Sequence, residues 1–277
     1  MRDVATPFLL RRHGAAALGA LLVAIALRAP AADGAGCGVA DAERARPDSG
    51  ALSLRLNIPA YRLDVLVDSV VDRSYGVAVG MRRHRTPVGA FAVDRIVWNP
   101  WWVPPDSPWA KDEKVTPPGP NNPMGRVKLV LGGAYYLHGT PFTTSIGGAA
   151  SHGCIRMRGE DAAALALLLQ SRAGVGPDTA AIPSILADTV SVFVDLTSPV
   201  PVAIVYEVAE LRGDTLLLHP DVYRRVPGRQ RALALQALLR AGHDTVGLRR
   251  ATLARALRRA RTRHVAVPLD SLRLVGR

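Results

Sequence analysis

The sequence predicts a mainly β protein, a sandwich or barrel-like domain with helical additions. Apolar and polar residues alternate in many short segments, and turn-forming residues separate these segments. Such alternation buries one face of each strand. Many short strands followed by two or three late helices are typical of a sandwich or barrel. The predicted strands cover residues 52–58, 62–68, 74–80, 127–133, 134–140, 188–196, 200–211 and 214–223. The Thr-Pro motif that opens residues 86–100 predicts a turn, fixed by Pro87 and Gly89, and the rest of this segment predicts a further strand.

The remaining elements follow from proline content and helical periodicity. Residues 99–125 hold many of the prolines and three of the four tryptophans, which predicts a long structured loop. An amphipathic pattern predicts a helix over 159–171, with two acidic residues in its first turn. A short helix is predicted within 177–187. Later helices are predicted at 229–241 and 250–262, with arginines on their outer faces.

Composition divides the chain into four segments. Arginines before an apolar run at 14–27, with small residues after it, predict an export signal over 1–31. The run is shorter than the ~20 residues of a spanning helix, so cleavage is favoured over an uncleaved anchor. A linker over 32–50, a strand-rich main domain over 51–223 and an arginine-rich helical extension over 224–277 complete the organisation.

The chain is strongly basic, with a formal net charge of +12 and only three lysines. This charge suits a polyanionic environment. No basic region is interleaved with stacking aromatic residues, which disfavours nucleic-acid binding. The two cysteines, Cys37 and Cys154, could form a disulfide in an oxidising compartment, which would block the Cys154 thiol.

The segment "SHGCIRM" carries the candidate chemistry. Cys154 lies two residues after His152, and His138 precedes both across a glycine-containing connector. An imidazole can take the proton of a thiol and so activate it as a nucleophile. The amides of Gly153 and Cys154 are candidate oxyanion donors, and Arg156 could bind a carboxylate. Together these groups predict an acyl-transfer centre.

Three alternative interpretations concern the same residues. Cys154 could be an inert buried residue, although a neighbouring His and Gly are poor composition for a core strand. A zinc site from His138, His152 and Cys154 is chemically reasonable, but it lacks a fourth ligand and any CxxC or HExxH spacing. Arg156 could be only a surface partner of Glu160 or Asp161.

These motifs resemble a known family. "HGT" followed by "SHGCIRM" is similar to the signature of L,D-transpeptidases of the YkuD (ErfK/YbiS-like) type. Residues 75–93, 116–125 and 159–165 resemble three further family segments, so the resemblance covers roughly 51–170. It implies a β-rich fold, a catalytic cysteine, no cofactor and no metal.

The resemblance also implies a role for each residue of the signature. Cys154 would be the nucleophile, His138 the proton acceptor, and the carbonyl of Gly139 would orient the histidine ring. Two residues after the cysteine, many family members carry Asn and others carry Arg, as this chain does at Arg156. The oxyanion and orienting group would be Gly139, Ser151, His152 and Gly153, and the substrate-binding group Arg156 and Tyr136.

The implied function is cross-linking of peptidoglycan stem peptides by an exported, periplasmic or wall-facing enzyme. Cys154 would attack the L-centre carbonyl of a tetrapeptide stem, release D-alanine and hold a thioester. Transfer to an amine would give a 3–3 cross-link or anchor an acceptor wall protein. Water as acceptor would make the enzyme a carboxypeptidase, and a non-catalytic wall-binding module is a further alternative. The resemblance implies no nucleic-acid partner, and membrane contact only through an uncleaved N-terminal segment.

Overall fold

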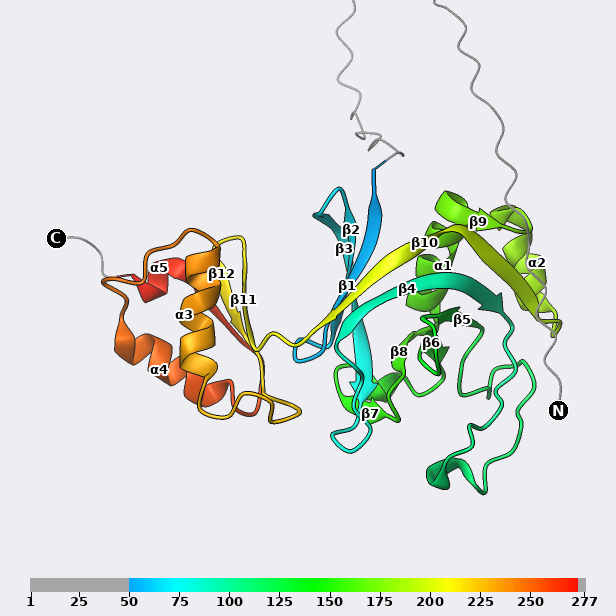
Figure 1. Ribbon diagram of the computed structural model, residues 1–277, viewed down its shortest axis with the longest axis horizontal. Helices are drawn as coiled ribbons and strands as arrows, with labels where there is room; N and C mark the ends of the chain where they lie inside the picture. Colours follow the sequence, from blue (N-terminus) through cyan, green and yellow to red (C-terminus); the bar gives the residue numbers. More distant parts are fainter. Residues whose placement is uncertain (1–49, 274–277) are drawn as a thin grey trace, which may run out of the picture. The chain divides into compact units, whose positions relative to one another are not determined.

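The computed structural model describes residues 50–273, and it is mainly β, as predicted (Figure 1). The predicted export signal, most of the linker and Cys37 lie outside the described residues. None of the described helices is long and apolar enough to cross a membrane.

The larger sheet closes on itself as a barrel. Its strand order runs β1-β2-β3-β8-β6-β5-β4-β10, and β10 also pairs in parallel with β1, which completes the ring. Closure leaves these strands without an open edge between β1 and β10. The barrel strands are β1 (Leu52–Asn57), β2 (Arg62–Val67), β3 (Val70–Gly80), β4 (Gly89–Trp98), β5 (Val127–Val130), β6 (Tyr136–Thr140), β8 (Ile155–Arg158) and β10 (Val192–Val205).

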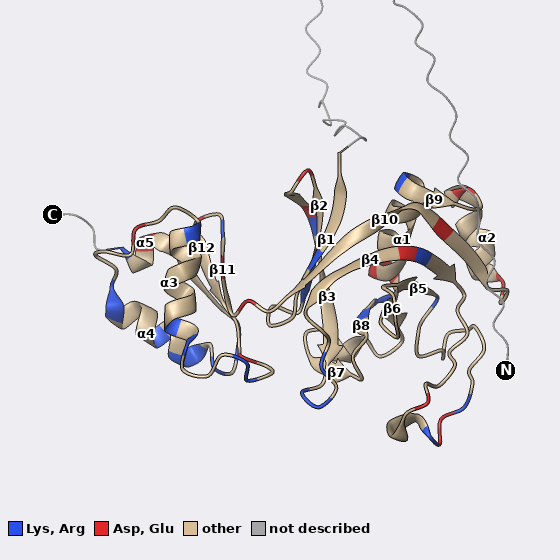
Figure 2. Cartoon of the chain, viewed as in Figure 1, with Lys and Arg blue, Asp and Glu red and all other residues tan. Residues whose placement is uncertain are grey.

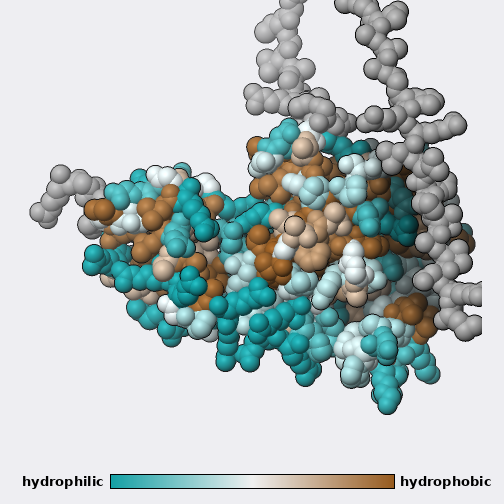
Figure 3. Space-filling model, in the orientation of Figure 1, coloured by the Kyte–Doolittle hydropathy of each residue, from teal (hydrophilic) through white to brown (hydrophobic). Residues whose placement is uncertain are grey.

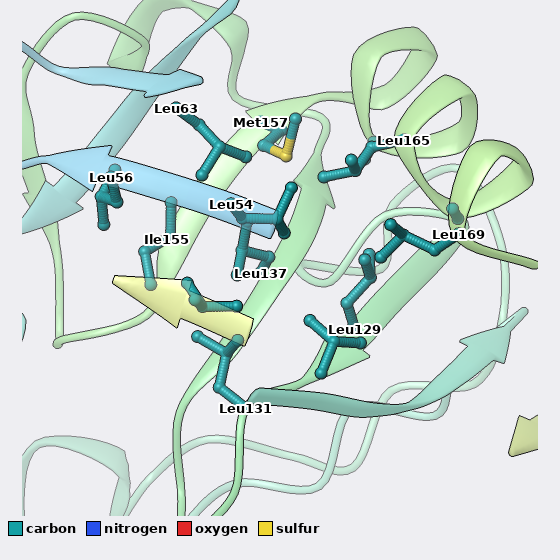
Figure 4. Close-up of a cluster of buried hydrophobic side chains, with 14 of the residues drawn as sticks. Leu54, Leu56, Leu63, Leu129, Leu131, Leu137, Ile155, Met157, Leu165 and Leu169 are labelled. Atoms are coloured by element: carbon teal, nitrogen blue, oxygen red, sulfur yellow. The ribbon is translucent and has the colours of Figure 1, made fainter. Parts of the chain in front are cut away.

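The barrel core follows from the period of two in each strand. Alternate residues of β5 and β8 are buried, and the last four residues of β6 are all buried. Helix α1 (Gly159–Ala173) packs on β5 and β6 (Figure 4). Each fully buried leucine contributes about 2 kcal/mol through removal of apolar surface from water. The side chains that meet here are Val127, Leu129, Leu137, Ile155, Met157, Leu165 and Leu169.

The proline-rich segment 99–125 is a structured loop, as predicted. It contains one short bridge, between Trp102 and Thr116, and one turn of 3-10 helix at Pro108–Ala110. The buried Asn122 side chain donates to three carbonyl oxygens of the loop and accepts the amide of Met124. This one side chain therefore replaces the backbone ladder that a proline-rich segment cannot form.

The boundaries predicted for two late strands were wrong. The segments predicted as separate strands at 188–196 and 200–211 contribute to one long strand, β10, with an irregularity before Val200. Pro199 lacks an amide hydrogen, so the ladder is interrupted there without ending. The second segment divides after Val205, because the Asn57 side chain bonds both backbone groups of Glu207.

A second, three-stranded sheet carries its own hydrophobic cluster, and it belongs to the same compact unit as the barrel. Both late helices are confirmed, and the helix predicted within 177–187 is α2 (Ile182–Ala187). The sheet takes two strands from before residue 224 and one from after it, so it crosses the predicted domain boundary. Its elements are β11 (Ala209–Arg212), β12 (Thr215–Leu218), α3 (Gln230–Arg240), α4 (Arg250–Arg259), β13 (Val265–Pro268) and α5 (Leu269–Leu272).

Candidate active site

Three neighbouring barrel strands bring the predicted polar residues into one row. β6 and β8 pair in parallel with His138 opposite Arg156, and β5 pairs with β6 with Lys128 opposite His138. Residues paired in register point to the same side of a sheet. The next residues along, Leu137 and Ile155, face the core. Burial of one face therefore aligns the polar residues on the other.

His138 is held in one orientation within this row. The ring is 4% exposed, and its Nδ1 lies 2.7 Å from the carbonyl oxygen of Gly139. A carbonyl can only accept, so Nδ1 carries the hydrogen and Nε2 keeps its lone pair. Burial lowers the pKa of His138 to about 4, helped by the nearby charges of Arg156 and Lys128 and opposed by the Gly139 carbonyl. At neutral pH the ring is a neutral proton acceptor.

Cys154 lies at the entry to β8, with its thiol half-buried. The Sγ atom is 3.8 Å from the carbonyl oxygen of Ala134, and the cysteine is free in the described part of the chain. Burial raises the pKa of the Cys154 thiol, while the Tyr136 amide, Arg156 and Lys128 act in the opposite direction. The resting thiol is therefore protonated and needs a base. The same two cations act on Cys154 and on His138.

The turn before Cys154 is shaped by Ser151 and Gly153. Ser151 Oγ donates to the Cys154 carbonyl at 2.5 Å and accepts the Gly153 amide at 3.1 Å. Gly153 has φ of +119°, and a Cβ there would lie 3.1 Å from the Tyr135 ring. Glycine is required by both the backbone conformation and the space. The Gly153 amide, predicted as an oxyanion donor, is already bonded to Ser151.

Two buried side chains that sequence reasoning missed, Thr86 and Tyr223, connect this turn to the end of β3. We call these two residues the brace. Thr86 Oγ1 donates to the Gly153 carbonyl at 2.9 Å and accepts the Gly80 amide at 2.8 Å. Tyr223 Oη accepts the Thr86 amide and donates to the Gly80 carbonyl. Thr86 lies in the Thr-Pro motif that predicted a turn, which was the available signal. Nothing near Tyr223 in the sequence indicates its role.

His152 faces the proline-rich loop. Its ring stacks on Trp109, with centroids 3.8 Å apart and planes 8° apart, and the His84 ring is 4.7 Å away. Burial, followed by the charges of His84, Arg156 and Arg83, lowers the pKa of His152. The stack gives Trp109 a packing partner outside its own loop. His152 thus connects the cysteine turn to the loop.

Arg156 and Tyr136 lie beside the cysteine and histidine. The alternative was a pairing of Arg156 with Glu160 or Asp161. Neither appears among the ion pairs of the described residues, in which Asp161 lies 4.0 Å from Arg158. Burial lowers the pKa of Arg156, and the Cys154 sulfur opposes the shift. Lys128 Nζ lies 4.8 Å from the centre of the Tyr136 ring. Within the described residues, no group of three His, Cys, Asp or Glu side chains is arranged to hold a metal ion.

The loop also packs closely on the histidine strand. Gly125 has φ of +63°, and a Cβ there would lie 2.7 Å from the carbonyl carbon of Gly139. Only a residue without a side chain permits this approach. Contact with Gly125 therefore supports the peptide unit whose carbonyl orients the His138 ring.

The fold and site define a β-barrel protein with a neutral histidine on one strand and a cysteine at the start of the neighbouring strand. Comparison with known families agrees with this class. The model of the L,D-transpeptidase catalytic domain (YkuD) matches residues 53–200, more than half of the chain, and the chain belongs to this family.

Individual relatives match shorter segments. The probable L,D-transpeptidase YbiS of Escherichia coli K12 is 36% identical over 93 residues, 31% of this chain and 30% of that protein. The probable L,D-transpeptidase ErfK/SrfK of the same strain is 30% identical over 124 residues, 42% of this chain and 40% of that protein. The chain thus spans about a third of the length of these relatives. A solved structure, L,D-transpeptidase 3 of Mycobacterium tuberculosis, aligns with a TM-score of 0.38 at 16% identity, over 56% of this chain and 61% of that one.

Proposed function

We propose that the chain is a peptidoglycan L,D-transpeptidase in which Cys154 is the nucleophile and His138 the general base. The observation that carries this proposal is that a buried, neutral imidazole bonded to the Gly139 carbonyl and a half-buried thiol are both influenced by the charges of Arg156 and Lys128. Membership of the family supports the reaction class.

The first half-reaction forms a thioester. Cys154 Sγ attacks the L-centre carbonyl of a tetrapeptide stem, and His138 Nε2 takes the thiol proton. Gly139 keeps the ring in the required tautomer by accepting from Nδ1. The negative charge on the carbonyl oxygen is stabilised by the Cys154 amide, because the Gly153 amide is occupied by Ser151. His138 returns the proton to the departing amine, the carbon–nitrogen bond breaks, and D-alanine leaves.

The second half-reaction releases the acyl group. The side-chain amine of a second stem attacks the thioester carbonyl and gives its proton to His138. The carbon–sulfur bond breaks, and the proton returns to Cys154 Sγ. The product is a 3–3 cross-link between stems. An amine of a wall protein in the same position would anchor that protein to the wall.

Arg156, Lys128 and Tyr136 form the substrate-binding side of the site in this proposal. The stem peptide carries carboxylates, which a guanidinium binds through paired hydrogen bonds. Partial burial of Arg156 and Lys128 strengthens such contacts, because the local dielectric is low. The Tyr136 ring sits under the lysine ammonium and limits its movement.

The proposed location is the periplasm or the wall-facing side of the membrane. The predicted export signal over 1–31 supports it, whether the segment is cleaved or retained as an anchor. Two alternatives use the same fold. An L,D-carboxypeptidase would pass the acyl group to water, and a non-catalytic module would only bind the wall.

The test of the nucleophile is acylation by a carbapenem, read by intact-protein mass. We expect the native chain and Cys37→Ala to gain one adduct, and Cys154→Ala to gain none. An adduct on Cys154→Ala would overturn the assignment, and no adduct on the native chain would favour the wall-binding module. Incubation with tetrapeptide muropeptides then separates cross-linked dimers, expected from transfer, from trimmed tripeptides, expected from hydrolysis.

A further inference from the structure

The C-terminal part of the chain concentrates positive charge on an exposed helix face. Residues 224–273 include 13 arginines, two aspartates and no lysine. In α4, Leu253 and Ala256 face the second hydrophobic cluster, while Arg255, Arg258 and Arg259 are exposed. Figure 2 marks basic positions along this helix. Two further exposed arginines follow the helix directly. We define the arginine face as Arg255, Arg258, Arg259, Arg261 and Arg263.

The arginine face has no internal counter-charge. Among the residues that the structure describes, none of its five members forms a salt bridge with a carboxylate. By contrast, Arg62, Arg95 and Arg212 of the remaining chain are each paired with an acidic residue. The face is therefore available to an external anion.

An apolar side chain projects from the loop that leads into α4. Val246 is 83% exposed, the highest value among the large hydrophobic side chains of the described residues. The loop is held in shape, because Asp244 Oδ1 accepts the Val246 amide at 2.9 Å and Gly247 adopts a φ of +76°. The valine is thus presented to the outside by a defined turn.

Val246 borders a small hollow that combines apolar walls with two cations. The hollow has a volume of about 310 Å³, and its edge carries Arg231 and Arg250. Hydrophobic and hydrophilic residues also lie side by side on the surface of this part of the chain in Figure 3. The apolar side chains that line the hollow are Leu235, Val246, Leu248 and Leu253.

We infer that the C-terminal part docks on the surface of an anionic phospholipid bilayer. The arginine face contacts lipid phosphates, and Val246 enters the boundary between headgroups and acyl chains. A soluble polyanion would neutralise the arginines but leave Val246 and the hollow in water. A bilayer meets both requirements, which is why the combination favours lipid over a wall polymer. This inference is independent of the chemistry at Cys154.

The electrostatic part is tested by co-sedimentation of the full chain with vesicles. Binding to phosphatidylglycerol–phosphatidylcholine vesicles is expected to exceed binding to phosphatidylcholine alone and to weaken with salt. The triple variant R255Q/R258Q/R259Q should bind about 100-fold more weakly, about fivefold for each arginine. The matched control R73Q/R95Q/R172Q removes the same charge elsewhere and should bind as the native chain does.

The role of the apolar side chain in vesicle binding is tested with Val246→Asp. Because the Val246 side chain is exposed, we expect this variant to fold normally. We expect about a tenfold loss of vesicle binding, since the valine can no longer enter the bilayer. Val70→Asp, at a side chain 70% exposed in β3, is the matched control and should bind normally. Equal binding to neutral and anionic vesicles would overturn the inference. The inference would also be overturned if Val246→Asp bound vesicles as the native chain does and the chain pelleted with purified sacculi only when its arginines were present. That combination would indicate a wall polymer as the partner.

Discussion

At the scale of single residues, the site depends on where protons sit. His138 is neutral because it is buried beside two cations, and its tautomer follows from the Gly139 carbonyl. Cys154 holds its proton because burial raises the pKa of its thiol. The two groups therefore rest as thiol and imidazole, and in the proposed mechanism the proton is transferred during the attack.

This resting state predicts the pH dependence of acylation. A histidine whose pKa is lowered to about 4 stays a proton acceptor through the range in which a free histidine would be protonated. The rate of carbapenem acylation should hold from neutrality down to about pH 5 and fall near pH 4. His138→Gln should lower the rate by about 10²- to 10⁴-fold. The measurement is stopped-flow acylation over pH 4 to 7.

The control for this pH series is circular dichroism of the same samples, which separates protonation of the base from unfolding. A decline centred near pH 6.5, with the fold intact, would contradict the environment assigned to His138. A His138→Gln variant with the native rate and profile would remove this residue from the mechanism.

At the scale of elements, a loop, a turn and two strand ends hold the cysteine in position. Thr86 and Tyr223 connect the end of β3 to the Gly153 carbonyl, and Trp109 stacks on His152 from the other side. The cysteine turn is thus bonded on one side and covered on the other. Neither contact involves neighbours in sequence.

The hydrogen bonds of the brace predict that the Thr86 hydroxyl affects both the free energy of unfolding and the acylation rate. Thr86→Val leaves the Gly80 amide and the Gly153 carbonyl without their buried partner, at a cost of about 1–3 kcal/mol in the free energy of unfolding. We also expect slower acylation, because the turn before Cys154 loosens. Thr86→Ser keeps the hydroxyl and should restore the rate. Urea unfolding and carbapenem acylation are the two measurements.

Comparison with Tyr223→Phe distinguishes positioning from general stability. The Tyr223→Phe variant loses the hydrogen bonds to Gly80 and Thr86 but keeps the hydrogen bond from Thr86 to the Gly153 carbonyl. It should be destabilised with a smaller change in acylation rate than Thr86→Val. Equal rates in Thr86→Val and the native chain would rule out a positioning role for Thr86.

At the scale of the whole molecule, a network of buried charges joins the barrel to the second sheet. Glu210 of β11 lies 2.8 Å from Arg62 of β2 and 2.8 Å from His219, and Arg212 lies 3.1 Å from Asp64. Burial alone would raise the pKa of Glu210, but bonds from His219 and Arg62 outweigh it and lower the pKa. The charged form is therefore the stable one in the folded chain.

This network predicts loss of stability in acid. Because folding lowers the pKa of Glu210, its contribution is fully present above the ordinary carboxyl value near 4.5 and is lost as the pH falls below it. Glu210→Gln should lower the free energy of unfolding at pH 7 by about 3 kcal/mol and flatten its acid dependence. Urea unfolding at pH 3 to 7 measures both effects.

The matched control is Asp195→Asn, which breaks the ion pair with Arg95 on the exposed side of β10. Those two side chains are 66% and 50% exposed, so the expected loss is below about 1 kcal/mol. Similar losses for Glu210→Gln and Asp195→Asn would contradict the assignment of a structural role to the buried network.

Much of the fold and site was predictable because the signals are local. The period of two identified most strands, and helical periodicity identified α1, α3 and α4. The pattern around Cys154 and His138 predicted the chemistry proposed for them, and the pairing of β6 with β8 places His138 opposite Arg156, two residues after Cys154. Strand alternation, helix periodicity and the order of reactive residues are properties of neighbouring positions, and the sequence by itself determined them.

The tertiary structure decided the features that depend on distant partners. The parallel pairing of β1 with β10 closes the barrel, and the Asn57 side chain ends β10 by bonding a residue 150 positions away. Thr86 reaches Gly153 across 67 positions, and Tyr223 bonds Thr86 across 137 positions to complete that brace. A local pattern specifies which side of a strand is buried, but it carries no information about which strand lies next to it. That choice follows from packing and hydrogen bonding of the whole chain.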